Sequence, residues 1–408
     1  MTKPTLTIPT LSLCVLTKGS GSRLAELLAD GRTYAGEIVV GVDASSSDDT
    51  FEVATRHADV VFRFEHTGIA EHARLVPLEL ATGDWILWLD DDERMDAAFR
   101  ELLPGLLSDH RYTHYWFLRK WLVEGDPPAY LDALPWALDW QLRLFRNDRR
   151  LVWIPPKAHH SYSVIGTGCY EERAAIVHYE RVLGGEGARR AKVASRRDEL
   201  GQGQYEDFYG RIDGVPTASL ENPPPPVGRL PVARQAPARI IGGIYPSDRS
   251  PLPPWGAGIT APGALAVPAT RRLVVRVAAI NRGTLRWVPP QAPWPRLFLS
   301  YHLRGARDSG VKRWDGTRTP VGRIVDPAES TSFLAVVEAP REPGDYVLEW
   351  DLVSEGECWF AECGSATATT ALRVLPNEPG PTPAGATSRI VAWASSVFGR
   401  AHRPGVRF

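Results

Sequence analysis

Apolar and polar positions alternate in blocks over the first half of the chain. Four short apolar runs predict buried β-strands at residues 11–17, 37–42, 60–64 and 84–89. The segments between them have helical spacing and predict helices at 23–29, 49–57 and 70–81. Strands that alternate with helices are typical of an α/β domain with a mostly parallel sheet.

Two later segments have a different pattern. Residues 216–268 hold 13 prolines, which excludes helix and central strand and predicts an extended connector. Residues 271–375 return to strand-like alternation without helices and predict an antiparallel β-sandwich. We therefore expect an α/β domain at 1–215, the connector at 216–268, the sandwich at 269–376 and a linker with a tail at 377–408.

Length and composition fit this organisation. The 408 residues suffice for two or three domains, and a net charge of −1 argues against a globally basic nucleic-acid-binding protein. No apolar run reaches the ~18–20 residues of a membrane span, and the N-terminus lacks the apolar core of a signal peptide. These features predict a cytoplasmic protein.

Four acidic residues, Asp90 to Glu93, directly follow the last predicted strand. Adjacent carboxylates repel each other, and a hard divalent cation with oxygen ligands removes that repulsion. The alternative is a solvated turn in which Asp92 caps a helix. Thr17 and Asp43 end two other predicted strands, and in parallel sheets ligands bind beyond the carboxyl ends of the strands.

Six segments, in this order along the chain, carry a family resemblance. They are SLCVLTK (12–18), EIVVGVDASSSDDT (37–50), ATGDWILWLDDDE (81–93), DWQLRLFRND (139–148), AHH (158–160) and IVHYERV (176–182). Together they resemble glycosyltransferase family 2, nucleotide-sugar transferases with a GT-A fold, and most closely its bacterial branch that includes lipopolysaccharide-core glucosyltransferases. The resemblance implies a Rossmann-like domain, a nucleotide-diphosphate sugar as donor and a divalent cation, Mg²⁺ or Mn²⁺, as cofactor.

The resemblance also implies a donor pocket. Asp43 matches the family acid that holds the nucleotide base or ribose, and Thr17 and Lys18 line the same pocket. Arg74 stands where it would reach a phosphate, the alternative being an arginine on a helix surface.

The carboxylate run matches the family's D-x-D motif. Asp90 would approach the ribose or the metal, and Asp92 the metal that bridges the diphosphate. Asp91 and Glu93 would be orienting or solvated groups beside the donor. His178 matches a histidine that completes the metal site in some relatives, the alternative being a histidine of the core or the surface.

An inverting transferase needs a base for the acceptor hydroxyl. Asp139 stands just before QLRLF, where the family usually carries an acid, and is the candidate; the alternative is a capping residue or a partner of Arg143. Trp136 and Trp140 lie beside it and are candidates for stacking on the acceptor sugar, although aromatic residues of this region also suit a protein core.

His159 and His160 match a family His-Glu pair and would face the acceptor, but the glutamate is replaced by His160. Two further departures are Gly19-Ser20-Gly21, where Asn-Glu is usual, and Leu75, where Asn is usual. These departures bear on donor preference and on the level of activity.

The second domain resembles the tryptophan-rich immunoglobulin-like domains of bacterial surface-polysaccharide proteins and of autophagy receptors. Segments such as NRGTLRW (281–287) and PGDYVLEWDLV (343–353) carry this likeness, and it implies that Trp287, Trp350 and Trp359 are core residues. The tail from Pro379 has arginines but no acid, and an amphipathic stretch at 388–398 would contact an anionic membrane or dock on the protein itself.

These observations predict a metal-dependent, inverting glycosyltransferase of the hexosyltransferase type, working in polysaccharide biosynthesis. It would move a sugar from a nucleotide-diphosphate sugar to a hydroxyl of a glycan, a lipid-linked sugar or a protein, at the inner face of the membrane. The alternative is an inactive GT-A-like scaffold that binds carbohydrate or protein. No feature of the sequence indicates nucleic-acid binding.

Overall fold

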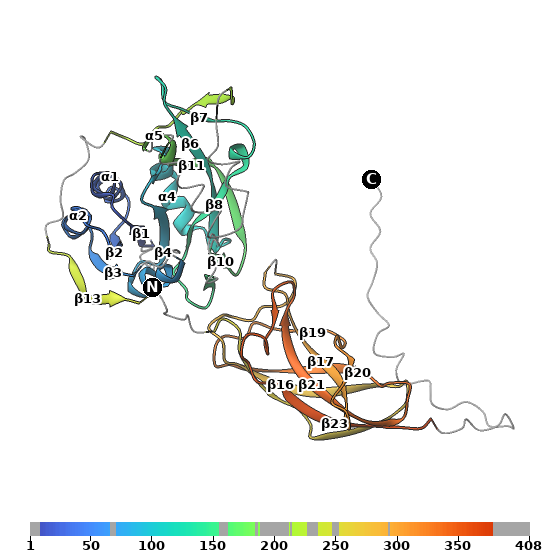
Figure 1. The fold of residues 1–408 in the computed structure, drawn as a ribbon. Helices are drawn as coiled ribbons and strands as arrows, with labels where there is room; N and C mark the ends of the chain where they lie inside the picture. The colour runs from blue at the N-terminus through green and yellow to red at the C-terminus, as the bar shows by residue number, and fades with distance from the viewer. Residues whose placement is uncertain are drawn as a thin grey trace, which may run out of the picture.

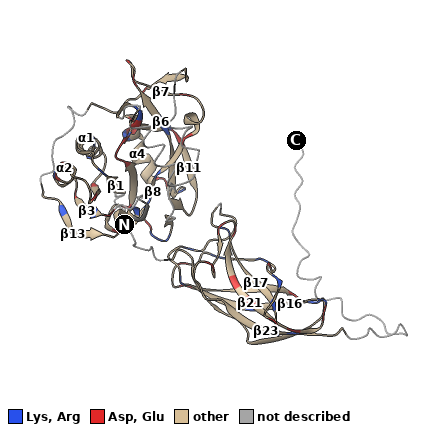
Figure 2. Cartoon of the chain, viewed as in Figure 1, with Lys and Arg blue, Asp and Glu red and all other residues tan. Residues whose placement is uncertain are grey.

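The computed structural model shows two domains (Figure 1). The residues that it describes are 9–65, 71–154, 162–183, 187, 212, 214–226, 236–246, 253–292 and 294–377. Lys and Arg are interspersed with Asp and Glu over both domains (Figure 2), as the near-zero net charge suggests. Within these ranges, no helix is long and apolar enough to cross a membrane.

The N-terminal domain begins with the predicted alternation of strands and helices. The elements are β1 (Leu11–Thr17), α1 (Gly21–Gly31), β2 (Glu37–Asp43), α2 (Thr50–His57), β3 (Val60–Phe64), the 3-10 turn η1 (Glu71–Arg74), α3 (Leu75–Leu80) and β4 (Trp85–Asp90). All four predicted strands are present, while the helix predicted at 70–81 is a 3-10 turn followed by a short α-helix. Strands β3, β2, β1 and β4 are parallel neighbours in this order, so the carboxyl ends of β1, β2 and β4 meet at one edge.

The rest of this domain extends the sheet beyond β4. Its elements are β5 (Glu93–Met95), α4 (Ala98–Ser108), β6 (His114–Val123), β7 (Ala129–Leu131), the 3-10 turn η2 (Trp136–Leu138), β8 (Trp140–Arg146), β9 (Val152–Trp153), β10 (Ser163–Val164), β11 (Gly168–His178) and α5 (Glu180–Leu183). Strand β8 is antiparallel to both β4 and β6, so the sheet is mixed rather than mostly parallel. The reason is that β6, β7 and β8 follow one another without the crossover helix that parallel neighbours require.

Helices cover both faces of the parallel half of the sheet. Apolar side chains of α1, α2 and α4, such as Leu24, Val53 and Phe99, are buried on one face. Leu75, Val76 and Leu78 of η1–α3 belong to a second cluster on the other face. This arrangement leaves the carboxyl edge of the sheet for polar side chains.

The segment predicted as a connector is extended where it is described, and it also contributes edge strands to the sheets. β12 (Thr217–Ser219) pairs with β7, and β13 (Arg239–Tyr245) pairs with β3. β14 (Ala257–Thr260) and β15 (Ala264–Pro268) belong to the C-terminal domain. Edge strands tolerate proline because one side of such a strand needs no partner.

The C-terminal domain, called the β domain below, consists of two sheets. One is β14–β16–β20, and the other is β15–β23–β21–β17–β18 with β19 and β22 attached. The remaining bounds are β16 (Arg272–Asn281), β17 (Leu297–Gly305), β18 (Val311–Arg313), β19 (Thr319–Pro320), β20 (Ser330–Glu338), β21 (Gly344–Ser354), β22 (Cys358–Trp359) and β23 (Ala368–Leu375). Buried residues of both sheets form one core, and Trp287, Trp350 and Trp359 are all buried as predicted.

Candidate active site

The carboxyl edge of the parallel strands brings together residues that are far apart in the sequence. Thr17 ends β1, Asp43 ends β2 and Asp90 ends β4. The backbone N–H of Tyr179 donates to the carbonyl oxygen of Asp92 at 2.8 Å, which ties the end of β11 to the same turn. Polar groups from four strands therefore surround the Asp90–Asp92 turn.

Asp43 and Lys18, both predicted to line the donor pocket, lie beside each other. One oxygen of the buried Asp43 carboxylate accepts from the backbone N–H and the hydroxyl of Ser45, both at 2.8 Å. The other oxygen lies 3.2 Å from the exposed Nζ of Lys18. Burial alone would raise the pKa of Asp43, but the hydrogen bonds from Ser45 and Lys18 outweigh it and lower the pKa. Asp43 is thus a buried carboxylate with an exposed cation beside it.

Asp91 faces the loop between β1 and α1. Its Oδ2 accepts hydrogen bonds from the hydroxyls of Thr17 and Ser20, each at 2.7 Å. Burial and the neighbouring Asp92 raise the pKa of Asp91. Thr17 and Asp91, both predicted at the donor, hold the loop and the turn together.

The glycines at 19 and 21 have a local structural reason. Gly19 has a φ of 57°, which favours glycine, and a Cβ at Gly21 would overlap the Asp49 carboxylate. The backbone N–H of Ser20 donates to the hydroxyl of Thr50 at 2.9 Å. The departure from the family pattern therefore accompanies a close approach of this loop to the start of α2.

Asp90 lies in a group of charged side chains with Glu93 and two arginines. Arg143 donates to Asp90 at 2.7 Å and to both oxygens of Glu93 at 2.8 and 3.0 Å. Arg74 lies 3.9 Å from Asp90 and also covers the ring of Trp88. Burial would raise the pKa of Asp90, but the charges of Arg143 and Arg74 hold it below its ordinary value. Glu93 is fully buried and orients Arg143, which excludes the solvated alternative for this residue.

A mixed carboxylate and imidazole cluster lies on the other side of the turn. Asp92, His178 and Glu180 each offer a ligand atom within 4.8 Å of the others, and His178 Nε2 is 3.3 Å from Asp92 Oδ2. His178 is buried against Trp121, whose ring centroid is 4.2 Å away. Two carboxylates and an imidazole suit Mn²⁺ or a similar divalent cation, so the residues fit the predicted cofactor. Asp90 lies outside this cluster because it is paired with arginines.

Asp139 is buried beneath the start of β8 and accepts three hydrogen bonds. Arg119 Nε and Trp121 Nε1 donate to Oδ2 at 2.7 Å each, and Gln141 Nε2 donates to Oδ1 at 2.6 Å. Burial would raise the pKa of Asp139, but Arg119 and these hydrogen bonds lower it. Its partner is Arg119 rather than the Arg143 that the sequence suggested. Trp121 links this carboxylate to His178 in the metal cluster.

The two tryptophans predicted at the acceptor differ in their surroundings. Trp136 is buried with Trp121 and Leu131, and the Arg181 guanidinium lies over its ring. Trp140 is half-buried, and its ring meets the edge of the exposed Tyr170 at 5.1 Å. Only Trp140 therefore keeps accessible ring surface. His159 and His160 lie outside the described residues.

Sequence reasoning missed Glu180, Arg119 and Trp121. Glu180 follows His178 by two positions, and this H-x-E spacing was the available signal. Arg119 and Trp121 are two positions apart on β6 and therefore lie on the same face of the strand. The family resemblance contained no segment from this strand.

Comparison with known proteins covers most residues of this site, but not His178 and Glu180. Residues 12–160 match the family model described as "Glycosyl transferase family 2", so this part of the chain is similar to that family. The match agrees with the family resemblance of the sequence.

Similarity to individual proteins is lower and partial. An uncharacterized glycosyltransferase of Rickettsia conorii is 26% identical over 108 residues, which is 26% of this chain and 36% of the relative. The chain thus spans about a third of the length of the curated relatives it matches.

Two solved structures show partial likeness. S. aureus TarS 1-349 is 14% identical with a TM-score of 0.32, and the match covers 46% of this chain and 66% of that one. Glucosyl-3-phosphoglycerate synthase from Mycobacterium tuberculosis, solved with Mn²⁺, UDP and glucosyl-3-phosphoglycerate, is 11% identical with a TM-score of 0.31. That match covers 55% of this chain and 96% of that one.

Proposed function

We propose that the N-terminal domain transfers a sugar from a nucleotide-diphosphate sugar to an acceptor hydroxyl. The observation that carries the proposal is the cluster of Asp92, His178 and Glu180, which lies with Asp90 and Asp43 at the carboxyl edge of the parallel strands, in a chain whose residues 12–160 match the family 2 model. This edge offers a site for a divalent cation, arginines for phosphate and a buried carboxylate for the nucleoside. These are the groups that a nucleotide-diphosphate donor requires.

In the proposed donor complex, Asp43 accepts hydrogen bonds from the base or ribose, and Lys18 moves aside or contacts the nucleotide. Asp90 faces the ribose, while Arg74, held between Asp90 and Trp88, reaches the diphosphate. Asp92, His178 and Glu180 hold the cation. When bound, the cation neutralises the charge that grows on the leaving nucleoside diphosphate.

Asp139 is the proposed base of an inverting transfer. Its lowered pKa keeps it ionised at neutral pH, so that it accepts a proton from an acceptor hydroxyl placed on the sugar face opposite the leaving group. Trp140 offers its accessible ring surface to the acceptor sugar. The hydrogen bond from Trp121 Nε1 then couples the base to the His178 side of the cation site.

The acceptor remains a glycan, a lipid-linked sugar or a protein hydroxyl in this proposal. The immunoglobulin-like assignment of the β domain is supported by its two sheets of mostly antiparallel strands around one tryptophan-containing core. The proposed enzyme transfers a hexose, works in polysaccharide biosynthesis, and is located in the cytoplasm at the inner face of the membrane. The membrane contact would be made by the C-terminal tail, which lies outside the described residues.

A nucleotide panel tests the donor. UDP, GDP and dTDP, each with Mn²⁺ or Mg²⁺, are added to the purified full-length protein, and the melting temperature is measured. One nucleoside diphosphate should raise the melting temperature by several degrees, and only with the cation, because ligands of the native state stabilise it by mass action. If no combination shifts the transition, the inactive-scaffold alternative replaces the transferase.

Asp139→Asn tests the base. This variant keeps the size and an acceptor oxygen, so nucleotide binding should be unchanged while transfer falls by about 10²–10⁴-fold. Gln141→Met removes one hydrogen bond to the same carboxylate and has no contact with the cation cluster among the described residues, so it serves as the matched control. If Asp139 is the base, only Asp139→Asn should lose most of the transfer rate, measured at saturating donor. Equal, moderate losses in both variants would assign Asp139 a positioning role instead.

A further inference from the structure

Strands β9 and β10 lie between β8 and β11 where the two domains meet, and they are called the hairpin below, with its described residues 148–154 and 162–165. Strands β9 and β10 pair with each other, and the backbone N–H of Ile165 donates to the carbonyl oxygen of Leu151 at 2.8 Å. Figure 1 shows β10 at the end of the N-terminal domain that faces the β domain. The base of this hairpin is therefore held by its own backbone and is open to contact from the other domain.

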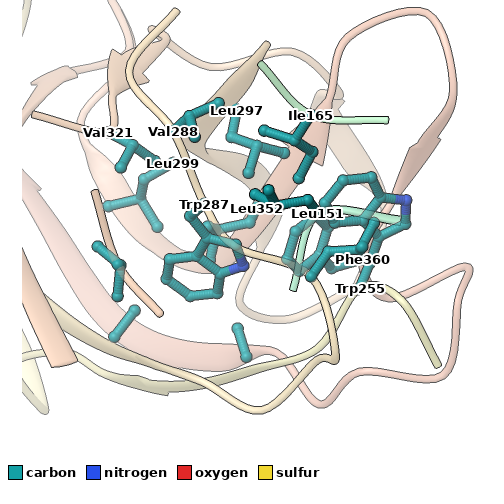
Figure 3. Packing of buried hydrophobic residues seen from close by; sticks show 14 of the residues in the cluster. Leu151, Ile165, Trp255, Trp287, Val288, Leu297, Leu299, Val321, Leu352 and Phe360 are labelled. Carbon is teal, nitrogen blue, oxygen red and sulfur yellow. The ribbon is translucent and has the colours of Figure 1, made fainter. Parts of the chain in front are cut away.

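Apolar side chains join the hairpin base to the β domain. Leu151 and Ile165 are buried in one cluster with Trp255, Trp287 and Phe360 (Figure 3). The rings of Trp255 and Phe360 stack with centroids 5.6 Å apart. The same cluster continues beneath β4, so the apolar core runs from one domain into the other through the hairpin.

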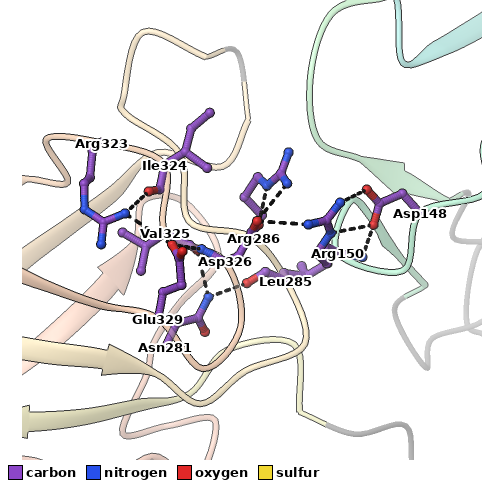
Figure 4. Close-up of polar contacts among 10 residues, drawn as sticks. All are labelled: Asp148, Arg150, Asn281, Leu285, Arg286, Arg323, Ile324, Val325, Asp326 and Glu329. Atoms are coloured by element: carbon purple, nitrogen blue, oxygen red, sulfur yellow. Dashed lines mark hydrogen bonds and ion pairs between the residues drawn. The ribbon is translucent and has the colours of Figure 1, made fainter.

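Polar contacts lie beside this apolar contact (Figure 4). The backbone N–H of Arg286 donates to the carbonyl oxygen of Arg150 at 2.8 Å. The Arg150 side chain donates to Asp326 at 3.0 Å, and Arg286 donates to the two oxygens of Asp326 at 2.5 and 3.0 Å. Hydrogen bonds from Arg286 hold the pKa of Asp326 below its ordinary value. One carboxylate of the β domain thus joins arginines from both domains.

Tyr162, which directly precedes β10, contacts side chains of the site described above. Tyr162 packs against Trp88 and Phe145, with ring centroids 5.2 and 4.8 Å apart. Trp88 stands two residues before Asp90 on β4, and Arg74 covers its ring. The hydroxyl of Tyr162 is buried and has no hydrogen-bond partner in the described structure, so ring packing and the hairpin itself keep Tyr162 in place.

We propose that Tyr162 is a positioning residue of the donor site and that the β domain holds it there by gripping the base of the hairpin. Tyr162 supports Trp88, which in turn supports Arg74 beside Asp90. The β domain is then a working part of the transferase rather than a module joined by a flexible connector. This role rests on the proposed function, because the geometry that it preserves is that of the donor site.

The continuity of the apolar cluster favours this role over loose attachment. Domains joined only by a linker are expected to move relative to each other unless their interface is large and hydrophobic. Here the apolar cluster, an ion-pair group and a backbone hydrogen bond act at the same hairpin. A displacement of the β domain would therefore move the hairpin base, and with it Tyr162.

The test uses the full chain with Leu151→Ala and Asp326→Ala combined. The matched control combines Leu372→Ala and Asp345→Ala, which remove a buried leucine and an ion-paired aspartate of the β domain far from the hairpin. Leu372 pairs with Tyr346 near the start of β21. This is six residues, or ~20 Å along the strand, from Leu352, which belongs to the cluster shown in Figure 3. Amide hydrogen exchange of the hairpin and the affinity for UDP with Mn²⁺ are measured on each folded protein.

In the interface variant, hairpin amides should exchange about tenfold faster or more, and UDP affinity in Mn²⁺ should fall about 3- to 30-fold. The control should change neither, and Leu151→Ile with Asp326→Glu should restore both. Unchanged exchange, equal changes in the control, or faster exchange with unaltered UDP affinity would each overturn the proposal. Failure of the unmodified protein to bind UDP would count against the proposed function alone, since hydrogen exchange still reports on the grip.

Discussion

Replacing Asp92 by asparagine is expected to abolish the cation-dependent binding of the donor nucleotide. Asp92 shares a ligand cluster with His178 and Glu180, and an amide there supplies no negative charge. We expect transfer to fall by about 10²–10³-fold or more, the size typical for loss of one transition-state charge stabiliser. The measurement is the melting-temperature shift given by nucleotide with and without Mn²⁺, together with the turnover of the donor.

The neighbouring Asp91→Asn is the matched control for this result. Asp91 turns toward Thr17 and Ser20, and an asparagine oxygen at the same place still accepts their hydrogen bonds. The raised pKa of Asp91 also means that removing its charge costs the fold little. Asp91→Asn should keep the response to Mn²⁺. If both variants lose that response equally, the turn as a whole, rather than the cluster around Asp92, is required.

His178→Gln extends the same argument to the second strand of the cluster. His178 reaches the site from β11, and its ring is fixed by Trp121 rather than by Asp92 alone. Loss of the imidazole should weaken Mn²⁺-dependent nucleotide binding without changing nucleotide binding that needs no cation. If His178→Gln binds nucleotide with Mn²⁺ as tightly as the unmodified protein, the cation site consists of the acidic turn without His178.

The part of the site that lies on the parallel strands could be predicted from the sequence. Apolar runs fixed where β1, β2 and β4 end, and parallel strands place their carboxyl ends together, so Thr17, Asp43 and Asp90 had to be neighbours. The direction of each side chain could not be predicted. Within the turn, Asp90 faces arginines, Asp91 the β1–α1 loop and Asp92 the histidine, and no local pattern distinguishes these three neighbours.

The antiparallel half of the sheet was harder to predict. Its strands β6, β7 and β8 are joined without helices, so the expectation of a mostly parallel sheet failed there. Arg119 on β6 pairs with Asp139 only because β6 and β8 are neighbours, which is a long-range fact that periodicity does not contain. The contact between the β domain and the hairpin could not be predicted for the same reason, because Arg150 and Asp326 are 176 residues apart in the sequence.

Arg143→Met is expected to be the most destabilising of the substitutions considered. Arg143 is almost fully buried and forms hydrogen bonds with Asp90 and with Glu93, whose side chain has no exposed surface. Removing the guanidinium leaves Glu93 with the backbone N–H of Asp90 at 3.1 Å and with the more distant charge of Arg119 at 3.4 Å. Loss of one partner of a buried ion pair costs about 3–5 kcal/mol, because the remaining charge is not solvated.

Arg272→Met is the comparison that separates burial from distance. Arg272 lies 2.8 Å from Glu338, as close as Arg143 lies to Glu93, but the two side chains are 74% and 38% exposed. An exposed pair contributes only about 0–1 kcal/mol, so Arg272→Met should leave the free energy of unfolding nearly unchanged. Chemical denaturation of both variants measures the difference. Because Arg143 also orients Asp90 in the proposed donor site, its loss should reduce nucleotide binding even below the melting transition. Similar stabilities for the two variants would show that Glu93 and Asp90 find other compensation, and that Arg143 belongs to the donor rather than to the fold.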